Sequence, residues 1–237
     1  MIISHEHPEY QKLRNKAKFQ NHGCWFYSNE IVDNIIPRVK TWRNWNTVGR
    51  DLTGMGDHFI VFLHDNSTPW NYEWLKKYKD LVLVCSSQYT MDSVKFSGRT
   101  IFLPMSIDTE YVKQFRAPEK TKDTCFYGNP WVLENADGGD LLKDKDLGIE
   151  FISNVSREEA LKAVAKFKRC YGIDRCAQEC QVLGCELMPL YTRYSCDNFS
   201  KVLDNRDAAK ILQEELDKLE KEEYTQEVPA FNIKEAK

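Results

Sequence analysis

The sequence has no long apolar run. No segment of the 237-residue chain approaches the roughly 20 consecutive apolar residues of a membrane-spanning helix. Met1 to Tyr10 also lacks the apolar stretch of a secretory signal. We therefore expect no membrane span and a cytoplasmic protein.

Charge of one sign is not in excess either. The chain has 33 Lys and Arg against 36 Asp and Glu, a formal net charge of -3, so its overall charge does not favour a nucleic-acid partner. With 42% hydrophobic and 29% charged residues, the composition is that of an ordinary folded chain, large enough for one core or two small ones. A largely disordered protein is not expected.

Closely paired cysteines, the usual mark of a structural zinc site, are missing. The eight cysteines mostly lie inside apolar runs such as 81–85, where a reduced thiol behaves as a small hydrophobe. Five fall between Cys170 and Cys196, but Cys176 and Cys180 are a helical turn apart and the others lie on strand-like runs. We expect buried free thiols that pack the core, with a metal site as the less favoured alternative for this cluster.

Short apolar runs alternate with amphipathic stretches along the first half of the chain. Runs at 24–27, 59–63, 80–85 and 99–104 predict strands, and helices are predicted at 29–39, 70–78 and 90–96. Two of these strands are apolar without interruption. Uninterrupted apolar strands separated by helices are typical of a parallel sheet covered on both faces.

The alternation restarts after a polar, proline-bearing segment at 115–122 that resembles a linker. Ser156 and Glu159 form a capping box that opens a helix through Phe167, and strands are predicted at 123–127, 148–153, 169–171 and 185–188. A long charged helix is predicted at 201–222, followed by a flexible tail at 223–237. The predicted fold class is α/β, with one half at 1–115 and a second at 116–200.

The most informative segment runs from Tyr171 to Pro189 and predicts a strand end, a glycine turn, a helix and another strand. Arg175 and Glu179 stand at i and i+4, so they share a helix face near the edge where parallel sheets bind ligands. The turn at Gly172 with Arg175 offers backbone N–H groups and a guanidinium to a diphosphate, and Glu179 could accept hydrogen bonds from ribose hydroxyls. Alternatively, Arg175 and Glu179 form only an exposed ion pair.

Three further places carry candidate site residues. Gly128 and Asn129 offer a second backbone approach to the phosphates, or a simple tight turn. His64 and Asp65 follow a predicted strand, where a histidine beside a carboxylate could be a general base or a hydrogen-bonded loop residue. A basic segment without acidic residues could contact nucleic acid or be a solvated loop anchored by its tryptophans. It contains Arg38, Lys40, Trp42, Arg43 and Trp45.

Three segments in this order resemble glycosyltransferases of the GT-B fold. Leu103-Pro104-Met105-Ser106-Ile107-Asp108 is similar to their interdomain LPxxID segment, Thr124 to Asn129 to the first strand and glycine loop of the donor domain, and Gly172 to Gly184 to their GxGRxALEAxxxG stretch. The resemblance implies two Rossmann-like halves that bind a nucleotide sugar, a UDP- or GDP-sugar, between them. It implies metal-independent transfer of a hexosyl or pentosyl group to a hydroxyl acceptor, with no cofactor other than the donor.

The resemblance also implies roles for single residues. Arg175 would neutralise the leaving diphosphate, Glu179 would hold ribose or sugar hydroxyls, and His64 with Asp65 would act at the acceptor side. Compact members of bacteriophage and bacterial type suggest a DNA base or a glycan as acceptor, and the host cytoplasm as location if a phage encodes the chain. Tyr171 stands where retaining members carry the first of two glutamates. The alternative is therefore a GT-B-like binding module that holds a nucleotide or a partner without catalysis; the sequence predicts no oligomeric state.

Overall fold

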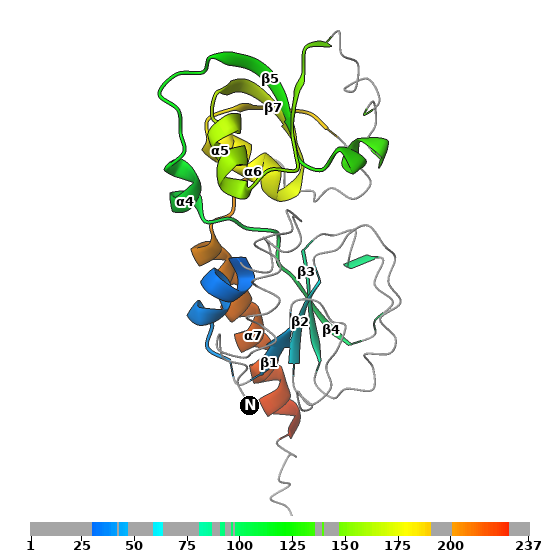
Figure 1. The fold of residues 1–237 in the computed structure, drawn as a ribbon. Helices are drawn as coiled ribbons and strands as arrows, with labels where there is room; N and C mark the ends of the chain where they lie inside the picture. The colour runs from blue at the N-terminus through cyan, green and yellow to red at the C-terminus, as the bar shows by residue number, and fades with distance from the viewer. Residues whose placement is uncertain are drawn as a thin grey trace, which may run out of the picture.

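The computed structural model of the chain describes residues 30–41, 43–46, 59–63, 81–86, 91–92, 96, 98–135, 139, 147–190 and 201–227. In these residues the strands form two four-stranded parallel sheets, one in each of two lobes (Figure 1). We call the lobe of strands β1 to β4 the N-lobe and the lobe of strands β5 to β8 the C-lobe. The fold is mixed α/β with parallel sheets, as the alternating pattern predicted.

The N-lobe sheet has the strand order β1-β2-β3-β4. Its strands are Asn44–Asn46, Phe59–Leu63, Val82–Cys85 and Arg99–Phe102. Ile60 is opposite Val82, and Val82 is opposite Arg99. Every residue of β3 is buried, as are residues 60–63 of β2. Burial on both faces explains why these two strands are apolar without interruption.

The C-lobe sheet has the order β6-β5-β7-β8, with strands at Glu150–Ile152, Lys122–Tyr127, Phe167–Gly172 and Glu186–Met188. The chain runs from β5 to β6 on one side, then crosses over β5 to β7 and continues to β8 on the other. Helices α5 (Arg157–Val164) and α6 (Asp174–Val182) make the last two connections. The direction of winding therefore reverses between β5 and β7, and such a reversal leaves a crevice at the carboxyl ends of the two strands.

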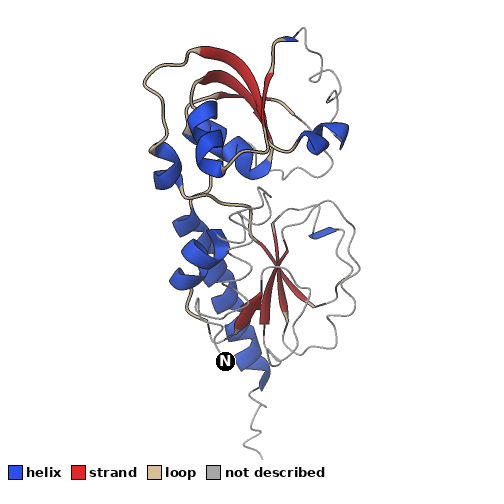
Figure 2. Cartoon of the chain, viewed as in Figure 1, coloured by secondary structure: helices blue, strands red, loops and turns tan. Residues whose placement is uncertain are grey.

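The last helix, α7 (Asn205–Glu227), packs on the N-lobe although it follows the C-lobe in the chain. Its buried side chains share one cluster with the helical segment at 30–38 and with β2, among them Ala208, Leu212, Leu216, Ile31, Ile35 and Ile60. Figure 1 shows α7 running beside that helical segment. In Figure 2, α5 and α6 lie below the C-lobe sheet, on the side of the N-lobe.

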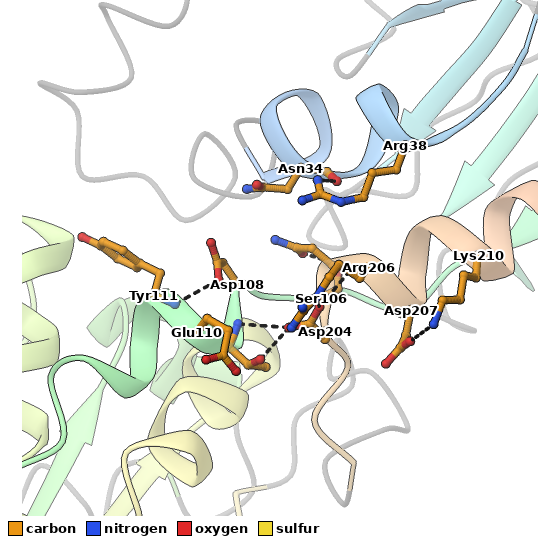
Figure 3. Close-up of polar contacts among 12 residues, drawn as sticks. Asn34, Arg38, Ser106, Asp108, Glu110, Tyr111, Asp204, Arg206, Asp207 and Lys210 are labelled. Atoms are coloured by element: carbon orange, nitrogen blue, oxygen red, sulfur yellow. Dashed lines mark hydrogen bonds and ion pairs between the residues drawn. The ribbon is translucent and has the colours of Figure 1, made fainter.

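Two chain crossings join the lobes and pair with each other. Ile107 lies in the first crossing, and Leu203 and Asn205 lie in the second. The backbone N–H of Ile107 donates to the carbonyl of Leu203 at 3.0 Å, and the carbonyl of Ile107 accepts from the backbone N–H of Asn205 at 3.0 Å. The Asp204 carboxylate accepts from Thr109, which begins α4 (Thr109–Lys113), and from the backbone N–H of Arg206 in α7 (Figure 3). The Asp204 side chain thus caps α7 and also holds the first residue of α4, whose own N-cap is Asp108.

The helical segment that was predicted at 29–39 departs from an α-helix. Ile31–Ile35 is wound as a π-helix, and Ile36–Arg38 continues as a 3-10 turn. Pro37 explains the change, because proline has no N–H to donate and its ring clashes with the carbonyl four residues earlier. The regular helix of the prediction is therefore wrong.

Other predicted boundaries were also wrong. Helix α7 continues to Glu227, so residues 223–227 belong to the helix and not to the predicted tail. Helix α5 ends at Val164, and Phe167, predicted to be helical, begins β7 with its ring buried. Residues 44–46, predicted as loop, form β1 beside β2. Helix α7 begins at Asn205 because the Asp204 side chain caps it, four residues after the predicted start. The capping box of Ser156 and Glu159 is confirmed.

Candidate functional site

The carboxyl ends of β5 and β7 bring two predicted site segments together. Tyr127, at the end of β5, is opposite Gly172, at the end of β7, so Gly128 and Asn129 leave the sheet beside the turn into α6. Gly128 has a φ of +149°, a conformation that side chains with a Cβ rarely adopt. The Asn129 side chain is exposed. The two glycine turns that were singled out from the sequence are therefore neighbours at one sheet edge.

Gly172 is required by close packing. A Cβ at this position would lie 3.2 Å from the backbone nitrogen of Ala177 and 3.3 Å from the carbonyl carbon of Cys176. The absent side chain lets the first turn of α6 approach the end of β7. The N-cap of α6 is Ile173, whose side chain has no oxygen to cap the first amides. Among the described residues, no side-chain cap hydrogen bond is made at this helix start, and a helix N-terminus favours an anion.

Glu179 is the centre of a buried ionic network. Its carboxylate is 0% exposed and accepts hydrogen bonds from the Tyr127 hydroxyl at 2.7 Å, Arg157 Nε at 2.9 Å and Arg175 Nη1 at 2.5 Å. Burial raises the pKa of Glu179, but the guanidiniums of Arg175 and Arg157 outweigh it, so the pKa is lowered. Glu179 is therefore an ionised carboxylate with both oxygens bonded to protein donors.

Arg175 is buried as well, and it donates to the same Glu179 oxygen as Arg157 does. The pairing of Arg175 with Glu179 across one helical turn is confirmed, but the alternative of an exposed pair is wrong. Burial works against the Arg175 charge, yet the neighbouring Glu179 carboxylate raises the pKa of the guanidinium. Arg175 is therefore a fixed cation one residue inside the start of α6.

Two network residues, Arg157 and Glu30, were missed by sequence reasoning. Arg157, at the start of α5, donates from Nη1 to Glu30 at 2.6 Å as well as to Glu179. Glu30 lies in the N-lobe, 3% exposed, and also accepts from Asn34 and Asn205. The Arg157 guanidinium lies 5.3 Å from the centre of the Tyr111 ring, on α4. No local spacing signals a contact between residues 127 positions apart.

The cysteines of the C-lobe lie in its core. Of the five cysteines that the structure describes in the C-lobe, Cys125, Cys170, Cys180 and Cys185 are buried free thiols and Cys176 is half-buried. The Cys180 S–H donates to Cys170 Sγ at 2.8 Å, and burial raises the pKa of Cys180 to about 12, so this thiol stays protonated. Within the described residues, no three His, Cys, Asp or Glu side chains gather as metal ligands do.

The basic segment divides into exposed and buried parts. Arg38 and Lys40 are exposed, and the backbone of Lys40 is bonded to the Gln213 side chain of α7. Arg43 is only 3% exposed, and Trp45 lies in β1 against the N-lobe core. Burial of Arg43 contradicts its predicted contact with a nucleic acid, whereas the packing of Trp45 agrees with the alternative of a tryptophan that anchors the segment to the core. Trp42, His64 and Asp65 lie outside the described residues.

The fold is that of a mixed α/β protein with two parallel sheets, and polar side chains lie at the end of its second sheet. Neither protein-family models nor curated proteins match the chain. In the part of the chain that the structure describes, no helix is both long and apolar enough to cross a membrane.

Proposed function

We propose that the chain is a GT-B-like glycosyltransferase that binds a nucleotide sugar at the carboxyl edge of the C-lobe sheet. One observation carries the proposal: the glycine turns at Gly128 and Gly172 meet at the point where the winding of this sheet reverses. Open parallel sheets bind nucleotides at such points. The uncapped start of α6 and the fixed cation of Arg175 complement a diphosphate at the same edge.

Each candidate residue then has a chemical task. Arg175 and the first amides of α6 stabilise the charge that develops on the leaving diphosphate, so fixed groups supply what a metal ion otherwise would. Gly128 and Asn129 approach the donor from the facing turn. Glu179 meets the ribose or sugar hydroxyls once a donor has displaced one of its protein partners. His64 and Asp65 act on the hydroxyl acceptor.

Calorimetric titration of the full chain against UDP-, GDP- and ADP-sugars tests the proposal. At least one donor should bind, and Gly172→Ala should weaken that binding. A folded chain that binds none of them would remove the proposal.

The second candidate is a binding module without catalysis. It is favoured by the complete pairing of the Glu179 carboxylate inside the protein and by the half-buried Tyr171 in place of a carboxylate. Donor hydrolysis in the absence of acceptor separates the two candidates, because a pure binder releases no nucleoside diphosphate. Hydrolysis that Glu179→Gln abolishes in a folded variant would reject the binding module.

Within the described part of the basic segment, the exposed cations that could support a nucleic-acid acceptor are Arg38 and Lys40. If the acceptor is DNA, these side chains neutralise phosphates and binding weakens steeply with salt. Filter binding at low and moderate salt, with Arg38→Ala and Lys40→Ala combined, measures this. A DNA affinity that changes neither with salt concentration nor with the double substitution would leave a glycan as the acceptor.

A further inference from the structure

A single guanidinium holds the two lobes together at the candidate site. Arg157 of the C-lobe donates to Glu30 of the N-lobe at 2.6 Å and to Glu179 of α6 at 2.9 Å. We call these three residues the interlobe latch. Because a guanidinium is planar and its N–H groups point in fixed directions, Arg157 keeps both bonds at only one separation of the lobes.

Both carboxylates remain hydrogen-bonded if Arg157 leaves Glu30. Glu30 still accepts from Asn34 Nδ2 at 2.9 Å and from Asn205 Nδ2 at 2.5 Å. Glu179 keeps its bonds to the Tyr127 hydroxyl and to Arg175. Glu30 Oε1, however, loses the donor that Arg157 supplies, and the Glu30 charge loses its cation, so opening has a cost that the bound ligand must exceed. Arg157 is therefore the member of the latch that can move.

Arg157 also has capacity for another acceptor. Its Nη2 lies 2.8 Å from Glu179 but makes none of the hydrogen bonds found among the described residues. The Arg157 side chain as a whole is 14% exposed, although the Nη2 atom itself is buried. Arg175 approaches the same oxygen of Glu179, which places two cations side by side. An additional anion at this point would be attracted by both guanidiniums.

We propose, on the basis of the proposed function, that the diphosphate of the donor takes Arg157 away from Glu30 and thereby opens the interlobe latch. Glu30 is then a competitor of the ligand. The free chain is held in the latched arrangement, which does not bind the diphosphate. The observed affinity is therefore the intrinsic affinity multiplied by the fraction of chains that are unlatched. Removal of the Glu30 charge increases donor affinity, whereas loss of a purely structural ion pair would leave it unchanged or weaken it.

Calorimetry on the full chain with UDP, GDP, ADP and inorganic pyrophosphate tests the latch. Glu30→Gln should bind the diphosphate probe roughly 3- to 10-fold more tightly than the unmodified chain. Glu30→Asp, which keeps the charge, should bind nearly as the unmodified chain does. Glu158→Gln is the matched control, because Glu158 follows Arg157 on α5 but pairs with Lys162 at the surface.

A second variant has the opposite expected sign. Once Arg157 has left, the described donors to Glu30 are Asn34 and Asn205, so Asn34→Ala penalises the open latch more than the closed one and should weaken diphosphate binding. Because Asn34 is half-buried, this variant is expected to fold even if Glu30→Gln does not. Small-angle scattering adds a ligand-free measurement: Glu30→Gln alone should change the lobe separation in the direction that UDP does.

The outcomes separate the two proposals. A folded Glu30→Gln chain that binds a diphosphate no more tightly than the unmodified chain overturns the latch and leaves the proposed function standing. The same holds for Asn34→Ala that binds more tightly. An unmodified chain that binds none of the four probes overturns both.

Discussion

Individual donors decide whether a charge can be buried in this protein. The Glu179 carboxylate has no exposure, and its lowered pKa shows that its partners outweigh the unfavourable effect of burial. Tyr127 is the neutral member of this set, and its hydroxyl is buried with the carboxylate. Removing that hydroxyl tests the network without changing the number of charges.

Tyr127→Phe should lower the free energy of unfolding by about 1.5 to 3 kcal/mol, the range for a hydrogen bond to a charged group. Urea denaturation followed by circular dichroism measures it. Lys162→Ala, which breaks an exposed pair on α5, is the control and should leave stability nearly unchanged. Equal effects of the two substitutions would show that the Glu179 network contributes nothing particular.

Residue contacts were predictable from the sequence only where they are local. The spacing of Arg175 and Glu179 predicts their pairing because a helix brings i and i+4 together. Tyr127 and Arg157 lie 52 and 22 positions from Glu179, and only the sheet register and the position of α5 bring them close. The sequence therefore identified the carboxylate and its partner Arg175, but not the partners Tyr127 and Arg157.

At the scale of elements, packing of α6 against β7 depends on one missing side chain. Gly172→Ala places a methyl group 3.2 Å from the Ala177 backbone, so α6 must shift. We expect a loss of about 1 to 3 kcal/mol of unfolding free energy and weaker donor binding. Gly184→Ala, at a φ of +79° after α6 with no neighbouring atom within 4 Å, is the control. It should lose stability through backbone strain and keep its ligand affinity; the same loss of affinity in both variants would contradict the assignment.

The caps at the junction between lobes give stability a dependence on pH. Burial raises the pKa of Asp204, but hydrogen bonds from Thr109 and Arg206 outweigh it and lower the pKa to about 2. The folded pKa is below the value of about 3.9 for an unfolded aspartate, so Asp204 contributes fully above about pH 4 and loses its contribution as the pH falls through its folded pKa.

Asp204→Asn should therefore show a smaller decline in melting temperature from about pH 4 to about pH 2 than the unmodified chain. Asp207→Asn, on the exposed face of the first turn of α7, is the control. Parallel curves for all three proteins would mean that Asp204 does not carry the effect.

Elements were predicted well where burial is two-sided and poorly where a single residue interrupts a pattern. The strand at Phe59–Leu63 has its predicted bounds, because an unbroken apolar run fits only a strand covered on both faces. The segment at 29–39 has helical spacing, but Pro37 removes a donor and changes the winding. Strand β1 has no apolar run because its only large apolar residue is Trp45.

At the scale of the whole molecule, each lobe has its own core, and the core of the N-lobe is built from two parts of the chain that are far apart in sequence. The buried cluster of the N-lobe contains residues from 31 to 105 together with α7, whereas that of the C-lobe is almost continuous in sequence. Closing the N-lobe core therefore requires α7 to return past the entire C-lobe. Sequence periodicity predicts the apolar stripe of α7, but not which core the stripe enters.

Substitutions in the two cores should consequently act on different lobes. Leu212→Ala empties a buried position of α7 and should destabilise by about 2 to 5 kcal/mol, as should Leu161→Ala in α5. Hydrogen exchange distinguishes them, because local opening follows the contacts of each lobe. Leu212→Ala should speed exchange in β2 and β3, more than 100 residues away in sequence, and leave β5 and β7 protected. Leu161→Ala should give the reverse pattern. If Leu212→Ala instead speeds exchange equally in all four strands, the two lobes unfold as one cooperative unit. The interlobe crossings and Arg157 would then transmit the loss of stability from the N-lobe to the C-lobe.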